Sequence, residues 1–135
     1  MYVLDTTALS ALMKAELGHV ERLMATNPGD VVLPQPALAE VRYGLERLGR
    51  SRRRAMLEEK LKLFLADIAR AVWDDRVSEE FGTLKARLEH QDRRLEDLDL
   101  TIAAHALAYE ATLVTSNVKH FKRITGLKIE DWSAL

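Results

Sequence analysis

Short runs of apolar residues recur along the chain, and polar or turn-forming residues bound each of them. The runs cover residues 2–4, 31–33, 71–73 and 113–114, and a fifth candidate lies at 128–129. Runs of this length with β-branched residues are typical of short buried strands. The pattern therefore predicts four strands and a fifth near the end of the chain.

Between these runs the apolar residues follow the spacing of amphipathic helices. The predicted helices cover residues 7–12, 37–48, 51–68, 77–88 and 98–111. Gly49 is expected to end the second helix and Ser51 to cap the third. Strands that alternate with helices indicate an α/β domain with a mainly parallel sheet.

The composition of the chain excludes several classes of protein. The chain has 135 residues, of which 47% are hydrophobic and 30% charged, so we expect one folded domain over residues 1–135. It has no cysteine, which excludes a disulfide framework and a thiolate metal site. We find no basic leader and no long apolar segment, so we expect a cytoplasmic protein without a membrane span. A net charge of -1 gives no general attraction to nucleic acid.

Acidic residues follow the predicted strands or open the next helix. Asp5 comes directly after the first strand, Glu40 lies early in the helix after the second, and Asp99 lies with Glu96 and Asp97 before the alanine-rich helix. Ligands of parallel sheets bind beyond the carboxyl ends of the strands, so these acids are expected at one edge. Asn117 adds an amide oxygen after the fourth strand.

Each of these residues also has a purely structural interpretation. Asp5 and Asp97 are suitable helix caps, Glu40 suits the positive end of a helix, and Asn117 suits a turn. As a set, their oxygen atoms suit Mg²⁺ or Mn²⁺ and point to phosphoryl chemistry.

Several segments together resemble the PIN-domain ribonucleases, and more narrowly the VapC-type toxins of bacterial toxin–antitoxin pairs. The similarity rests on VLDT at 3–6, LAEVRYGLER at 38–47, LDLTIAAHA at 98–106, ATLVTSNVKHF at 111–121 and EDW at 130–132. Thr7 departs from the family, which often has Asn or Ser there, although its hydroxyl can still donate a hydrogen bond.

The resemblance implies a PIN-like three-layer α/β fold and a metal-dependent endoribonuclease. It implies that Asp5, Asp99 and, through water, Glu40 hold Mg²⁺, with Mn²⁺ as a substitute. Asn117 and Asp97 are weaker candidate ligands, and the candidate substrate contacts are Thr6, Thr115 and Arg42. The resemblance also implies an RNA substrate, a homodimer, and a VapB-like antitoxin that covers the active site.

Two other functions remain open from the sequence. One is a catalytically degenerate PIN-like module that only binds protein. The other is a metal-dependent phosphatase with Asp5 as nucleophile, although Thr7 stands where such enzymes generally have a second acid. The arginines between Arg47 and Arg54 fit an RNA-binding rim, an antitoxin-facing patch or a solvated helix start.

Overall fold

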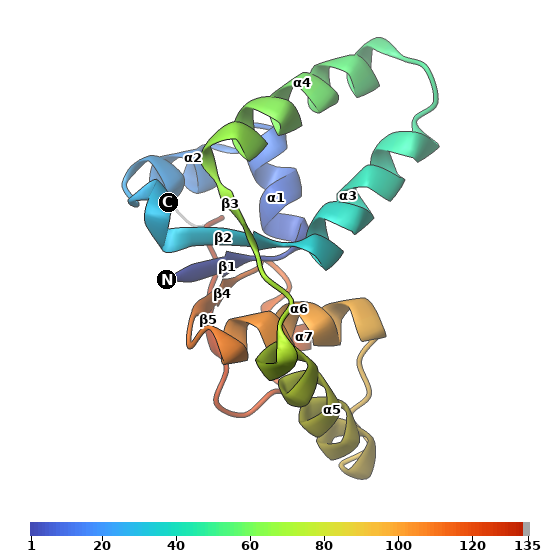
Figure 1. Ribbon diagram of the computed structural model, residues 1–135. Helices are drawn as coiled ribbons and strands as arrows, with labels where there is room; N and C mark the ends of the chain where they lie inside the picture. The colour runs from blue at the N-terminus through green and yellow to red at the C-terminus, as the bar shows by residue number, and fades with distance from the viewer. Residues whose placement is uncertain (134–135) are drawn as a thin grey trace.

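Five short parallel strands form one sheet in the computed structural model, which describes residues 1–133 (Figure 1). The strands are β1 (Tyr2–Leu4), β2 (Val31–Pro34), β3 (Ala69–Ala71), β4 (Thr112–Val114) and β5 (Lys128–Glu130). Their spatial order is β3-β2-β1-β4-β5, and Val3 is paired with Val32 on one side and Leu113 on the other. The α/β fold with a parallel sheet is confirmed.

Helices cover both faces of the sheet, which gives the molecule three layers. Figure 1 shows α1 to α4 on one face, where α3 and α4 form a projecting pair, and α5 to α7 on the other. The helices are α1 (Thr6–Met13), α2 (Leu17–Met24), α3 (Gln35–Arg47), α4 (Arg52–Asp67), α5 (Asp75–His90), α6 (Asp97–Ala108) and α7 (Val118–Phe121), and a 3₁₀ turn spans Pro28–Asp30.

Burial on both faces explains why the central strands are almost wholly apolar. Val3, Leu4, Leu33 and Leu113 are fully buried, and all four residues of β2 are buried. Parallel strands covered by helices on both sides have no solvated face, so they lack the alternation of a half-exposed strand.

The strand order creates a switch point between β1 and β4. The chain moves from β1 to β2 and β3 in one direction, and then crosses to β4 and β5 on the other side of β1. At the carboxyl edge, the Asp5 N–H donates to the carbonyl oxygen of Val114 at 3.1 Å. Ligand sites of open α/β sheets form at such a point.

The third strand lies two residues earlier than the sequence predicts. It covers Ala69–Ala71, and the side chains of Val72 and Trp73 are exposed. The Val72 N–H donates to the Tyr109 hydroxyl at 2.7 Å, so the chain has already left the sheet there. The prediction of a strand over 71–73 was wrong because apolar composition alone does not distinguish a strand from the loop after it.

Two helices, α2 and α7, were not predicted. Helix α2 packs against the end of the described chain, and its Gly18 is required there. A Cβ at Gly18 would lie 2.5 Å from the carbonyl oxygen of Trp132. The expected end of α3 and start of α4 are confirmed: Gly49, at a φ of 62°, follows α3, and the Ser51 Oγ accepts from the Arg54 N–H at 3.1 Å.

Leu113→Ala is expected to lower the free energy of unfolding by about 2–5 kcal/mol, because Leu113 is fully buried in a central strand. Urea unfolding followed by circular dichroism measures this change. Leu63→Ala is the matched control, since 62% of Leu63 is exposed and the expected change is within about 0.5 kcal/mol. Equal losses in the two variants would contradict this placement of the core.

Candidate active site at the carboxyl edge of the sheet

Asp5 directly follows β1 and caps α1, and its carboxylate is held at the switch point. The Oδ1 atom accepts from the Thr7 hydroxyl at 2.6 Å and from the Ala8 N–H at 2.9 Å. Only 3% of Asp5 is exposed. The capping interpretation of Asp5 is therefore confirmed, and the cap itself fixes the carboxylate at the edge where a ligand would bind.

The charge of Asp5 is poorly compensated. Within residues 1–133, no lysine, arginine or histidine forms an ion pair with it. Burial raises the pKa of Asp5, although hydrogen bonds from Thr115, Thr7 and Ala8 act in the opposite direction. A buried carboxylate without a positive partner is costly, and a bound cation would offset that cost. The oxygen atoms of the Asp5 carboxylate also suit a hard divalent ion as ligands.

Glu40 is linked to the same edge through the residue after Asp5. The Thr6 hydroxyl, at the start of α1, donates to the Oε1 atom of Glu40 on α3 at 2.7 Å. Both side chains are half-buried. The N-cap that orients α1 therefore also positions the hydroxyl that holds Glu40.

Asp99 lies in the first turn of α6, which packs against β1 and α3. Its Oδ2 accepts from the His120 Nε2–H at 2.8 Å, and both side chains are about one quarter exposed. His120 belongs to α7, which follows β4. No local sequence pattern indicates this contact, because the two residues are 21 positions apart.

Thr7 and Thr115 join the ends of β1 and β4. The Thr7 hydroxyl donates to Asp5 and accepts from the Ser116 N–H at 3.0 Å. The Thr115 hydroxyl is fully buried and accepts from the Asn117 N–H at 2.9 Å. The expectation that Thr7 still donates a hydroxyl hydrogen bond is confirmed.

The structure does not bring Asp97 into this group. Asp97 is exposed, and its Oδ1 lies 3.0 Å from the Lys85 Nζ on α5. The expected cap role of Asp97 was wrong, since Glu96 is the N-cap and Asp97 is the first residue of α6. That shift by one residue turns Asp97 toward α5.

Asn117 and Arg42 make no side-chain contact with the three acids among the described residues. The Asn117 side chain is exposed at the start of α7. Arg42 lines a depression with Glu58 and Glu59 of α4, whereas Glu40 lines a different cavity. The positions of Arg42 and Glu40 differ by two residues on a helix, so they occupy different sides of α3.

The acids share one edge but do not form a closed metal cluster. In the part of the chain that is described, no three His, Asp or Glu side chains lie close enough to hold an ion together. Asp5, Glu40 and Asp99 are instead engaged by Thr7, Thr6 and His120 respectively. Hydroxyl and imidazole groups thus orient the carboxylates individually.

The sheet order and the acidic edge define an α/β protein with its ligand site at a switch point. The PIN domain matches residues 2–127. The chain belongs to the PIN-domain family and, within it, to the VapC ribonucleases. It is 32% identical over 136 residues to ribonuclease VapC2 of Rickettsia felis, covering 98% of each chain. It is 29% identical over 132 residues to the tRNA(fMet)-specific endonuclease VapC of Shigella flexneri, again covering 98% of each.

Solved structures agree with this membership. VapBC2 from Rickettsia felis, bound to a DNA fragment from its promoter, matches with a TM-score of 0.85 and 30% identity, covering 97% of this chain and 98% of that one. DNA-bound VapBC from Salmonella typhimurium matches with a TM-score of 0.85 and 25% identity, covering 97% of each chain. The expected PIN-like fold is confirmed.

Asp5→Asn is expected to raise the free energy of unfolding at pH 7 in metal-free buffer, because the amide keeps a cap acceptor and removes a buried charge. Burial raises the pKa of Asp5 above its ordinary 3.8. At pH values between the ordinary and the raised pKa, Asp5 therefore binds more protons in the folded protein than in the unfolded chain. Stability therefore falls as the pH rises through the raised pKa, and the variant lacks this fall. Urea unfolding at pH 7 and pH 3 measures the difference.

The gain should be present at pH 7 and absent at pH 3, where the carboxyl group is protonated in both states. Asp92→Asn is the control, since Asp92 is exposed and its left-handed φ of 56° suits asparagine. An equal effect of Asp5→Asn at the two pH values would show that its charge is not the cause.

Proposed function

We propose that this protein is the endoribonuclease toxin of a toxin–antitoxin pair and hydrolyses RNA phosphodiester bonds with the help of a divalent cation. The observation that carries the proposal is the buried, uncompensated Asp5 carboxylate at the switch point. Membership of the VapC ribonucleases supports RNA as the substrate. We place the activity in the cytoplasm, in a single domain over residues 1–135.

We propose Asp5 and Asp99 as direct ligands and Glu40 as a ligand through water. When bound, Mg²⁺, or Mn²⁺ in its place, supplies Lewis acidity toward water and positive charge for the phosphate. Asp5 binds from a rigid position, because its other contacts are the cap of α1 and the Thr7 hydroxyl. Thr6 is a positioning residue for Glu40, and His120 orients Asp99.

Thr115 and Asn117 contribute differently in this proposal. Thr115 is fully buried, so its role is to support Asp5 through a hydrogen bond and not to contact the substrate. Asn117 is exposed at the same edge and remains a weak candidate for ion or substrate contact. The ion pair of Asp97 with Lys85 favours a surface role for Asp97, and the position of Arg42 across α3 favours a contact away from the scissile bond.

The other two candidate functions have less support. A phosphatase with Asp5 as nucleophile needs a second acid at position 7, where the Thr7 hydroxyl is instead committed to Asp5 and Ser116. A degenerate binding module gives no reason to keep three carboxylates, each oriented by a hydrogen bond, at one edge.

We further propose a VapB-like antitoxin partner and a homodimer. VapBC complexes from Rickettsia felis and Salmonella typhimurium share the fold of this chain, which supports the antitoxin. Exposed apolar side chains support contacts with other protein chains: Val72 is 64% exposed and Trp73 48%.

Asp99→Asn is expected to reduce RNA cleavage at least about 100-fold, since even partners that only orient metal ligands contribute about 10–100-fold. Asp97→Asn is the matched control on the same helix and should cleave normally, because Asp97 pairs with Lys85 on α5. Cleavage of total RNA with Mn²⁺, mapped by sequencing of the new ends, measures both. Circular dichroism checks that both variants fold.

Metal dependence is tested in the same assay. EDTA should abolish cleavage by the wild-type protein and added Mn²⁺ should restore it. Cleavage that persists in EDTA, or equal losses in Asp99→Asn and Asp97→Asn, would contradict the proposed ligand set.

A further inference from the structure

A cavity of about 290 Å³ begins at the proposed active site and extends between α1, α3 and α4. Its polar lining residues are Thr6, Ser10, Lys14, Glu40 and Arg53. Because the Thr6 hydroxyl is bonded to Glu40, one end of the cavity is the acidic edge itself. A strand of RNA with its scissile phosphate at this edge would therefore lie beside the mouth of the cavity.

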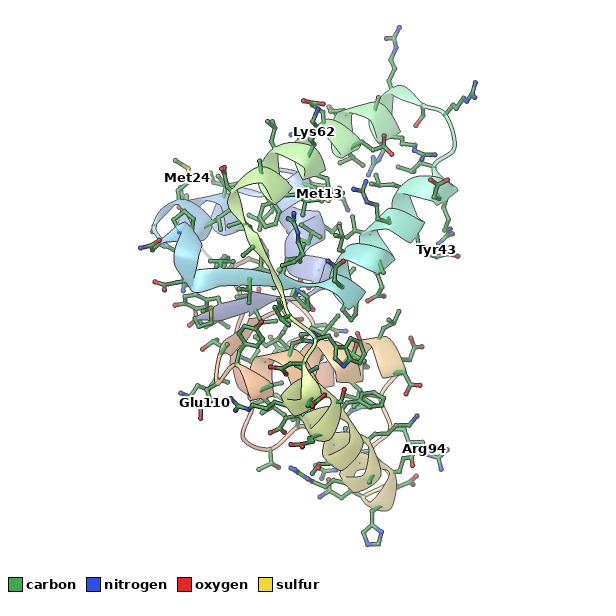
Figure 2. The ribbon with its side chains drawn as sticks, in the orientation of Figure 1. Met13, Met24, Tyr43, Lys62, Arg94 and Glu110 are labelled. Carbon is green, nitrogen blue, oxygen red and sulfur yellow. The ribbon has the colours of Figure 1, made fainter. Side chains whose placement is uncertain are left out.

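The rest of the lining is apolar, and the volume is small. The apolar side chains are Met13, Val41, Leu45, Leu48 and Leu57, and Figure 2 shows Met13 in the space between α1 and the α3–α4 pair. The volume lies just below the usual range for small-molecule sites, about 300–1,000 Å³. Such a space suits one planar group with apolar faces, and an unstacked nucleobase is such a group.

Gly44 keeps this space open at α3. It lies inside the helix, where glycine is less favourable than alanine, and it also lines the cavity. A Cβ at Gly44 would have no protein atom within 4 Å, so packing within the chain does not require glycine. A group that approaches from outside the protein gives a reason for the missing side chain.

Lys14 and Arg53 add positive charge at the rim. Across the described residues neither forms an ion pair, whereas the adjacent Arg54 is paired with Glu46 and Glu58. Arg53 lies in the first turn of α4, where a positive charge is unfavourable and a nearby anion would offset it. Arginine and lysine at the mouth of an apolar cavity match the phosphates on either side of an inserted base.

We propose that this cavity binds one unpaired base of the RNA next to the scissile phosphate, and that Lys14 and Arg53 contact the flanking phosphates. The inference rests on the proposed ribonuclease function and adds a site for recognition of the substrate. Recognition through an extruded base restricts cleavage to RNA segments that are single-stranded or readily unstacked.

The test uses single-stranded RNA across a mapped cleavage position, with one abasic nucleotide moved stepwise along it. Fluorescence anisotropy measures its affinity for Asp5→Asn protein, in which loss of a proposed metal ligand is expected to prevent cleavage. One abasic position should weaken binding about 10-fold, as expected for loss of a single base contact. Gly44→Leu, which fills the cavity, should weaken binding of the intact RNA similarly and remove the effect of that abasic position.

Gly82→Leu is the matched control. Gly82 is also inside a helix, α5, with no atom within 4 Å of an added Cβ, but it does not line this cavity. This variant should keep both the affinity and the abasic profile. Thermal unfolding of both leucine variants verifies that each is folded.

An abasic profile that is unchanged in Gly44→Leu overturns the proposed base site while leaving the ribonuclease function intact. Wild-type protein that cleaves no RNA would instead overturn the function itself, and the base site with it. If Gly44→Leu disrupts only binding of a companion antitoxin and leaves RNA binding unchanged, the cavity is a protein site and the proposal is wrong.

The phosphate contacts are tested separately by the salt dependence of binding. Removing both charges with Lys14→Gln and Arg53→Gln should decrease the slope of log affinity against log salt by about 1.4, or about 0.7 for each lost contact to single-stranded RNA. Arg76→Gln on α5 is the control for a general change in charge. An equal decrease in the control would contradict specific contacts at the rim.

Discussion

The buried carboxylate of Asp5 is the constraint on which the arrangement of the site depends. Asp5 directly follows a central strand, caps the first helix and is only 3% exposed between the ends of β1 and β4. Its neighbours satisfy its hydrogen bonds through hydroxyl and amide groups without neutralising its charge. The fold therefore maintains a negative charge where burial disfavours it, and a cation is the simplest compensation.

The same constraint positions the other acids. As the cap of α1, Asp5 sets the direction in which Thr6 and Thr7 leave the sheet. Thr6 then holds Glu40, and Thr7 ties the start of α1 to Ser116 beyond β4. Thr7 thereby fixes the end of β4, which leads into α7. Helix α7 carries His120, the residue that contacts Asp99. The contacts that cap α1 thus also fix the geometry of the site.

Much of the fold could be predicted from local patterns. The strands β1, β2 and β4, which are mostly apolar, and the caps Asp5 and Ser51 follow from residue type and spacing. The third strand was misplaced because Val72 and Trp73 are as apolar as a strand, although they are exposed. Helix α2 was missed although Leu17, Val20 and Leu23 follow helical spacing; its buried residues are Gly18 and His19, and Leu23 packs against the core.

The site was predictable as a set of residue types and not as a set of contacts. Parallel strand ends and the family resemblance together predicted Asp5, Glu40 and Asp99 as the site residues. The structure separates the two acids of α6, because Asp97 pairs with Lys85 and Asp99 with His120. Which acid faces which partner depends on the residue at which α6 begins. The Thr6–Glu40 contact spans 34 positions, so no local pattern encodes it. The cavity beside Gly44 depends on three helices and is invisible in sequence.

The central claim is that a divalent cation compensates the charge of Asp5, and calorimetric titration of the wild-type protein with Mn²⁺ tests it most directly. The account predicts saturable binding that raises the thermal midpoint of unfolding, and that is lost in Asp5→Asn while Asp92→Asn retains it. Equal Mn²⁺ affinity in the wild type and Asp5→Asn, or a midpoint that Mn²⁺ does not change, would contradict the account.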